Sequence, residues 1–411
     1  MKEIAREYRG FFKNFSFQTK RFILAMFILS LTQNAYSTIF NLYLSYGGIK
    51  NVVIGQIIFM SGIGASIIAL PSGFIGDRVG RKKLLVASAL VLPVLLLIES
   101  ITINVTTLTI VSVLNGIAGV ILHISTDPFL AENSKQEERV HLFSLFFILS
   151  NLGAVFGSFF AGRLVLLFKV SQFLSLRYTL IVFAVLSFLP FLIVLPMEDK
   201  KTTVVKPQFL TREDFSLILK FGAQNAFIGF GAGMSLPFLN LYFSQVFGMH
   251  PSSISTIFSV SSIFFLFFGL FGPRISRRIG VVKGALLYEI LSVPFLIILA
   301  QSIPLYLAVF SFWMRGGLMN AGSPLLSTIQ MSLVSQERRG TLTSFLNLFD
   351  NIFRAFGTLL GGAVIQKVGF QINFLFTAIF YIIAIAIFYF FFRDRNILES
   401  APIEESVEIN I

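Results

Sequence analysis

Residues 73–83 read GFIGDRVGRKK, a short run of glycine and charge between two long apolar stretches. Gly73 lets neighbouring helices pack closely, and Gly80 permits a tight turn. The same run holds one acid and two arginines, Asp77, Arg78 and Arg81. This arrangement predicts a tight, charged turn that joins two membrane-spanning helices at the face of a bilayer.

The composition of the whole chain agrees with a membrane setting. Of the 411 residues, 55% are hydrophobic and 13% are charged, whereas soluble domains have about 25% charged residues. This excludes an ordinary soluble enzyme and a disordered chain. There is no cysteine, which excludes disulfides, thiolate metal sites and a cysteine nucleophile. No phosphate-loop motif occurs, so we expect no ATPase activity. We also expect no metal and no cofactor.

Long apolar runs extend on both sides of residues 73–83. A spanning helix needs about 20 apolar residues, and the first run, from Phe22, has no cleavage site and is expected to be retained. Twelve candidate spans follow: 22–46, 53–74, 84–104, 106–129, 142–166, 175–196, 215–246, 252–273, 282–302, 304–328, 341–366 and 371–392.

The distribution of positive charge predicts the orientation of these spans. With the N-terminus inside, 25 of the 32 lysines and arginines lie in inner segments, four in outer loops and three within spans. Cytoplasmic loops carry such an excess of lysine and arginine. We therefore expect a multi-pass plasma-membrane protein with both termini cytoplasmic. The net charge of +12 is then a topology signal, and no nucleic-acid partner is expected.

The two halves of the chain repeat at an offset close to 200 residues. Asn115 matches Arg315, and residues 136–144 match residues 336–344. The other matched positions are Asn41 with Asn240, Asn151 with Asn351, Gly157 with Gly357, and Gly162 with Gly362. Because each half begins inside and has six spans, the repeats are parallel, which predicts a substrate site between two bundles near the bilayer midplane.

The repeat divides the chain into two bundles joined by a linker. The fold class is an all-α polytopic membrane protein with twelve helices in two six-helix bundles related by pseudo-twofold symmetry. The predicted parts are a cytoplasmic segment 1–21, a first bundle 22–196, a cytoplasmic linker 197–214, a second bundle 215–392 and a cytoplasmic tail 393–411.

Residues 73–83 resemble the G-x-x-x-D-[RK]-x-G-[RK]-[RK] signature of the major facilitator superfamily. This resemblance implies the twelve-helix fold and a turn that stabilises the outward-facing state. The implied gating residues are Gly73, Asp77, Arg78, Gly80, Arg81, Asp127 and Glu132. The alternative is that the basic residues serve topology only. The second copy departs from the pattern, since Arg277 stands where Asp77 stands in the first.

A second pattern lies in the fifth span, where residues 153–162 read GAVFGSFFAG. They are similar to the family's antiporter motif, but Ser158 replaces its proline and Ala161 one of its glycines. Plain packing of helices through small residues explains the pattern as well. The motif therefore favours export only weakly.

Ionisable residues inside spans are functional candidates, because charge in hydrocarbon is costly. Arg354 lies near the middle of span eleven with Asp350 one turn before it. They form either an internal ion pair or a substrate-anion site with a proton site at Asp350. Arg315 needs an acid, a carbonyl or a substrate anion. By analogy with the family, Glu99 and Glu289 lie in peripheral helices and are expected to be structural or near an interface.

Polar residues of the spans that line the family's central cavity complete the list of candidates. The substrate pathway is predicted to contain Gln33, Asn34, Tyr36, Asn41, His123, Asn225, Asn240, Arg315, Asn320 and Arg354. His123 is a proton relay in one interpretation and a satisfied hydrogen-bonding residue in the other. Gly229, Gly231 and Gly233, with Pro237 after them, are expected to let span seven bend.

These features favour a secondary transporter that moves a small organic solute by alternating access, with protons as the coupling ion and a weak lean to efflux. The alternative is an uptake symporter or facilitator for a sugar or organic anion. A non-transporting receptor or scaffold is a remote third. No acid, histidine or metal cluster indicates an enzyme. The expected partners are a small-molecule substrate, the lipid bilayer and protons, with the chain as a monomer.

Overall fold

The computed structural model describes residues 15–132, 134, 139–198, 212–334 and 338–392, and this part of the chain is helical, without strands. The first half contains α2 (Phe17–Tyr46), α3 (Asn51–Val79), α4 (Arg81–Ile101), α5 (Val105–Glu132), α6 (Arg139–Leu167), α7 (Gln172–Leu186) and α8 (Leu189–Val194). The second half contains α9 (Arg212–Ser235), the 3₁₀ turn η2 (Leu236–Phe238), α10 (Leu239–Phe247), α11 (Pro251–Gly269), α12 (Gly272–Ile279), α13 (Val281–Leu299), α14 (Leu305–Ala321), α15 (Ser323–Ser332), α16 (Arg339–Val368) and α17 (Phe370–Phe392).

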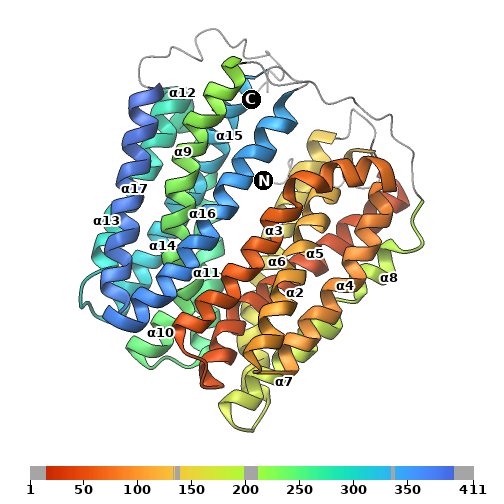
Figure 1. The fold of residues 1–411 in the computed structure, drawn as a ribbon, viewed down its shortest axis with the longest axis vertical. Coiled ribbons are helices and arrows are strands. Elements are labelled where there is room, and N and C mark those ends of the chain that lie inside the picture. Colours follow the sequence, from red (N-terminus) through yellow and green to blue (C-terminus); the bar gives the residue numbers. More distant parts are fainter. Residues whose placement is uncertain (1–14, 133, 135–138, 199–211, 335–337, 393–411) are drawn as a thin grey trace, which may run out of the picture.

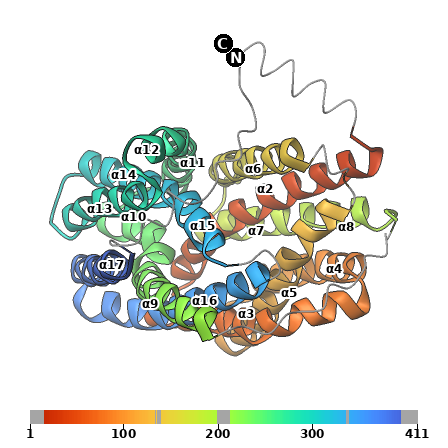
Figure 2. The ribbon, with the colours of Figure 1, turned by 90° about the horizontal axis from the view of Figure 1, so that it is seen from above.

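The helices form two bundles that lie side by side. Figure 2 shows α2–α8 on one side and α9–α17 on the other, as the repeat predicts. The bundles meet along two seams, where α3 packs against α16 and α6 packs against α11. At the first seam, a Cβ on Gly55 would lie 2.6 Å from the carbonyl oxygen of Thr358. The two helices can approach this closely only because the residue is glycine.

Within the described residues, eleven helical segments are long and apolar enough to cross a membrane, and they correspond to the predicted spans other than the tenth. The predicted tenth span is divided into α14 and α15 at Gly322, and the sixth is likewise divided, into α7 and α8. Pro324 lies in the first turn of α15, and proline has no backbone N–H to continue the ladder of α14. Span seven is also interrupted, by η2 at Pro237.

Two glycines confirm the predicted turn and its repeat. Gly80 separates α3 from α4 with φ +98°, and Gly280 separates α12 from α13 with φ +86°. Only glycine adopts such angles without strain. The backbone of residues 73–79 is helical, but the side chains of the predicted gating residues Gly73, Asp77, Arg78 and Glu132 lie outside the described ones. Their gating role stays a prediction.

Within each bundle, glycines let helices touch. A Cβ on Gly157 of α6 would overlap the carbonyl oxygen of Leu31 in α2. The matched Gly357 of α16 stands in the same relation to the carbonyl oxygen of Phe230 in α9. This geometry supports the packing interpretation of residues 153–162.

The glycines of span seven also lie at close helix contacts. Helix α9 continues through Gly229, Gly231 and Gly233 to Ser235. A Cβ on Gly233 would overlap the carbonyl oxygen of Arg354 in α16, whereas Gly231 faces α17. The span is interrupted just after these glycines, at Pro237, and a bend at the glycines themselves stays a prediction.

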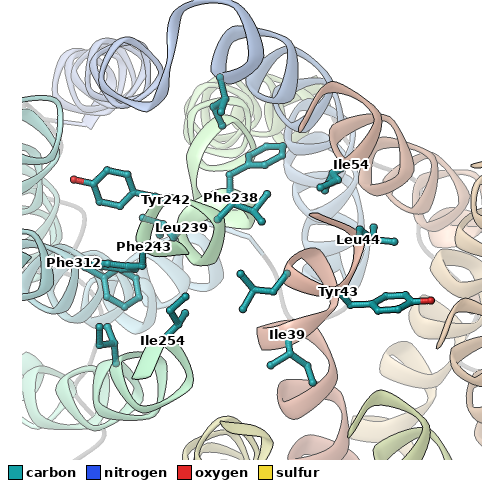
Figure 3. Packing of buried hydrophobic residues seen from close by; sticks show 14 of the residues in the cluster. Ile39, Tyr43, Leu44, Ile54, Phe238, Leu239, Tyr242, Phe243, Ile254 and Phe312 are labelled. Atoms are coloured by element: carbon teal, nitrogen blue, oxygen red, sulfur yellow. The ribbon is translucent and has the colours of Figure 1, made fainter. Parts of the chain in front are cut away.

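One hydrophobic cluster joins the bundles at the end of the molecule where α2 ends at Tyr46 and α10 ends at Phe247, here named the closed end. Figure 1 shows α10 and the start of α7 at this lower end. Figure 3 shows side chains of the cluster on both bundles, with Ile39 and Tyr43 on α2 and with Phe238 and Leu239 on the segment after α9. All four side chains are buried. The bundles therefore share one apolar core at this end.

Candidate functional site

A cavity of about 530 Å³ lies between the bundles, directly inside the closed end. Its volume is in the range of small-molecule sites. The first bundle contributes Asn34, Tyr36, Ser37, Thr38, Phe40, Asn41, Ile57, Ile58, Ser61, Glu99, Ser112, Asn115 and Ser158. The second bundle contributes Leu236, Pro237, Asn240, Phe258, Ser261 and Ser262. The lining thus contains both polar groups, which are hydroxyls and amides, and apolar groups, which are aromatic and aliphatic. Such a mixture suits an amphipathic molecule.

Two asparagines connect the bundles at the floor of this cavity. The Asn41 side-chain amide donates to the carbonyl oxygen of Pro237 at 2.6 Å. The Asn240 amide donates in the opposite direction, to the carbonyl oxygen of Thr38 at 2.9 Å. The interruption of span seven at Pro237 places its carbonyl at the bundle interface. These matched asparagines of the repeat therefore form a reciprocal pair, named here the amide latch.

A second set of amides extends the contact toward the loops. The Asn51 side chain and the Gln245 side chain exchange two hydrogen bonds of 3.0 Å. The backbone N–H of Asn51 donates to Gln366 of α16 at 3.1 Å, and Gln245 donates to Ser45 at 3.2 Å. All of these bonds join one bundle to the other. Among the described residues, the polar contacts between the bundles at the closed end are therefore neutral hydrogen bonds, which add to the apolar cluster there.

Glu99 lies at the wall of the cavity, which corrects the expectation that it is peripheral. Its side chain is 2% exposed. Asn115 of α5 donates to both carboxyl oxygens at 3.3 and 3.2 Å, and Ser112 donates to one at 3.2 Å. The Tyr36 hydroxyl approaches the other oxygen at 3.5 Å while donating to the carbonyl of Leu96 at 3.0 Å. Among the described residues, no cation pairs with Glu99.

The sequence contains little signal for this site. Tyr36 and Glu99 are 63 residues apart, and helix packing alone brings them together. The one available hint was the pairing of Ser112 with Asn115, which presents two donors on one face of a helix one turn apart. An acid in the adjacent span is the natural partner for such a pair.

Arg315 lies away from the cavity lining. The guanidinium is 3% exposed, donates to the hydroxyl of Tyr381 in α17 and lies 5.4 Å from that ring. Its Nε has no hydrogen-bond partner. These contacts favour the interpretation in which Arg315 has a structural partner over the one in which it contacts substrate.

Asp350 and Arg354 form the internal ion pair that their spacing predicts. Arg354 donates from Nε and from a terminal nitrogen to the two carboxyl oxygens, at 3.0 and 2.9 Å. The pair is on α16, where Gly229 of α9 packs against Asp350. Neither residue lines the cavity described above. The two charges balance one another within one helix.

The other predicted residues are divided between the cavity and its surroundings. Asn34, Tyr36, Asn41 and Asn240 line the cavity, whereas Gln33, His123, Asn225 and Asn320 do not. His123, Asp127 and Asn320 are exposed, and Gln33, Asn225 and Arg81 are half-buried. Asn320 donates to the carbonyl of Gly316 in its own helix.

The remaining buried acid is in the core of the second bundle. The side-chain amide of Gln224 donates to Glu289 at 3.1 Å, and Glu289 is fully buried. The amide oxygen of Gln224 and the second carboxyl oxygen of Glu289 have no hydrogen-bond partner. Glu289 is therefore structural, as expected. The described residues contain no group of three histidine or acidic side chains arranged to hold a metal ion.

Comparisons with known proteins agree with this architecture. The family model described as the Major Facilitator Superfamily matches residues 22–225 and again residues 222–408. The multidrug resistance protein MdtG of Klebsiella pneumoniae (strain 342) is 26% identical over 76% of this chain and 77% of its own length. MdtG of Salmonella choleraesuis (strain SC-B67) is 25% identical over 76% of this chain and 79% of its own length.

Solved structures share the fold at low sequence identity. A crystal structure of a single-residue mutant of the nucleoside transporter NupG superimposes with a TM-score of 0.75 at 16% identity, covering 91% of this chain and all of that one. A bacterial homologue of the lysosomal transporter Spinster, inward-facing and occupied, gives 0.74 at 13% identity, covering 90% and 95%. With two matched repeats, two bundles and a cavity between them, the chain belongs to the Major Facilitator Superfamily of membrane transporters.

Proposed function

We propose that this transporter exports small amphipathic molecules by alternating access and uses protons as the coupling ion. The observation that carries the proposal is the cavity, which has polar and apolar walls drawn from both bundles and is closed at one end by the amide latch. A site of this kind opens to one side at a time if the bundles rock about it.

The charge distribution supports a cytoplasm-facing state. The excess of lysine and arginine supports a cytoplasmic position for residues 1–21, 197–214 and 393–411. The loop between α2 and α3 is then outside, and the closed end with it. In this state the cavity would load from the cytoplasm, which is the direction that an exporter needs.

The relatives support export over uptake. Two proteins that cover three quarters of this chain are named multidrug resistance proteins. For the coupling residue we propose Asp350, because its bidentate bond to Arg354 needs an ionised carboxylate. Protonation of Asp350 would release Arg354 on a helix that packs on both bundles. The chain is expected to act as a monomer and without enzymatic activity.

Proteoliposomes with an acidic lumen test this proposal. The probes are rhodamine 6G, a cation, uridine, a neutral nucleoside, and fluorescein, an anion. An exporter reconstituted with its cytoplasmic side outward accumulates a probe in the lumen as protons leave, and collapse of the pH gradient abolishes the accumulation. Liposomes without protein are the control.

Two results would contradict parts of the proposal. A probe that equilibrates at the same rate with and without the pH gradient identifies a facilitator, and proton coupling is then wrong. Accumulation only when protons enter together with the probe identifies a symporter, the uptake alternative. Either result leaves the family unchanged.

A further inference from the structure

The charge of the cavity wall points to the kind of substrate. The lining contains one ionisable acid, Glu99, and its described residues include no lysine, arginine or histidine. Arg315 is bonded to Tyr381, and Arg354 is bonded to Asp350, so neither faces this cavity with a free charge. When Glu99 is ionised, the wall of the cavity therefore carries a negative charge that no described lysine, arginine or histidine of the lining balances.

The carboxyl group of Glu99 has capacity for a stronger partner than it has now. Its hydrogen bonds, from Asn115, Ser112 and Tyr36, measure 3.2–3.5 Å. All three donors are neutral, so no described residue supplies a positive charge to balance an ionised Glu99. An incoming cation would supply that charge, and the Coulomb attraction between two opposite charges is stronger in a site that excludes water than in bulk water.

The rest of the wall suits the apolar part of such a molecule. Tyr36 and Phe40 are stacked with their ring centroids 5.3 Å apart, and Phe258 comes from the opposite bundle. Aromatic faces attract cations, most strongly where water is excluded. A cavity whose lining contains one carboxyl group and several aromatic rings suits a cationic head on an apolar body.

We propose that the cavity binds amphipathic cations and that Glu99 is the residue that anchors the positive group. The inference rests on the proposed function, since it takes the cavity as the substrate site. It assigns a specificity role to an acid of the third span, and it excludes organic anions from this cavity by repulsion.

Equilibrium dialysis of the purified full-length protein in detergent tests the inference without a gradient. The probes are tetraphenylphosphonium and tetraphenylborate, which have the same shape and opposite charge. The parent protein is expected to prefer the phosphonium. Glu99→Gln is expected to lose about tenfold to a hundredfold in affinity for it. The matched control is Glu289→Gln, the same change at a buried acid outside the cavity, and it should bind as the parent does.

A second variant separates charge from folding. Glu99→Asp keeps the negative charge and should keep the preference for the phosphonium even where Glu99→Gln loses stability. The inference is overturned if Glu99→Gln binds the phosphonium as tightly as the parent, if the borate binds better, or if folded Glu99→Asp loses the preference as well. If the gradient drives transport of uridine or fluorescein alone, the cation preference is wrong and the proposal of export still holds. If the phosphonium binds but no probe is transported, the cation site is supported and the proposal of export is wrong.

Discussion

The amide latch makes a quantitative prediction about the conformational equilibrium. Asn41→Ala removes the 2.6 Å bond to Pro237, and Asn240→Ala removes the 2.9 Å bond to Thr38. A neutral hydrogen bond contributes about 1 kcal/mol net, which is roughly a fivefold change in an equilibrium constant. If the two bonds act independently, the double variant shifts the equilibrium by about 2 kcal/mol, or roughly thirtyfold.

The direction of the shift follows from where the bonds are. Both bonds exist only when the bundles meet at the closed end, so their loss raises the population in which that end is open. The hydrophobic cluster around Tyr43 and Leu239 is untouched. The variants should therefore fold normally and differ from the parent in the balance between two states.

The absence of cysteine makes the measurement direct, since spin labels can be attached at introduced cysteines only. Tyr46 at the end of α2 is 43% exposed, and Val246 near the end of α10 is 42% exposed. Labels at Tyr46→Cys and Val246→Cys report the separation of the bundles at the closed end by electron–electron double resonance. The parent should give mainly a short distance, and the latch variants should gain a longer one.

Asn34→Ala is the matched control for this experiment. Asn34 is on the same helix and lines the same cavity, but its amide donates only within α2, to Ser30 at 2.8 Å. Its distance distribution should equal that of the parent. The reasoning is refuted if the double latch variant keeps the parent distribution, or if Asn34→Ala produces the same long-distance population.

Three further predictions concern coupling, charge burial and packing. Asp350→Asn should keep exchange of substrate across proteoliposomes but lose accumulation driven by a pH gradient; retained accumulation would exclude Asp350 as the coupling residue. Tyr381→Phe removes the hydrogen-bond acceptor of the buried Arg315 and should lower the free energy of unfolding by about 1.5–3 kcal/mol. We expect a lower thermal unfolding midpoint and an unchanged affinity for the phosphonium. A change in affinity alone would instead place Arg315 at the substrate. Gly157→Ala should lower the thermal unfolding midpoint, because the added methyl group pushes α6 away from α2 and overpacking of this kind costs about 1–3 kcal/mol. Gly119→Ala is the control, since a Cβ at that position meets nothing within 4 Å, and it should leave the midpoint unchanged. Equal effects of the two variants would contradict the packing role of Gly157.

Local patterns in the sequence predicted most of the fold. Apolar runs located the spans, and the repeat offset predicted two bundles with matched turns at Gly80 and Gly280. The breaks within spans six and ten were not predicted, because hydropathy averages over a window and does not register where the helical backbone is interrupted, as it is at Gly322 before Pro324.

The site was only partly predictable, because its geometry depends on contacts between distant segments. Asn41 and Asn240 were found by their position in the repeat, and the structure places both at the cavity. Glu99 was assigned to a peripheral helix by analogy, since nothing in its own span shows that Tyr36 and Asn115 surround it. The partner of Arg315 is 66 residues away, and no spacing rule connects the two.

Positions that match between the two halves and positions that differ between them are expected to have different functions, in closure of the bundles and in substrate recognition. Asn41 and Asn240 match in the repeat and make the same bond in opposite directions. Asn115 and Arg315 also match, but one is an amide that holds Glu99 at the cavity and the other is a cation bonded to Tyr381. A rocking motion needs both bundles to close in the same way, so its residues are expected to be symmetric. Recognition of one charged group needs only one anchor, and an equivalent anchor in the second half would compete with it. The charge of the substrate is therefore expected to be selected in the first bundle, where Asn115 holds Glu99, and Asn115→Arg is predicted to alter which probe binds before it alters whether the bundles move.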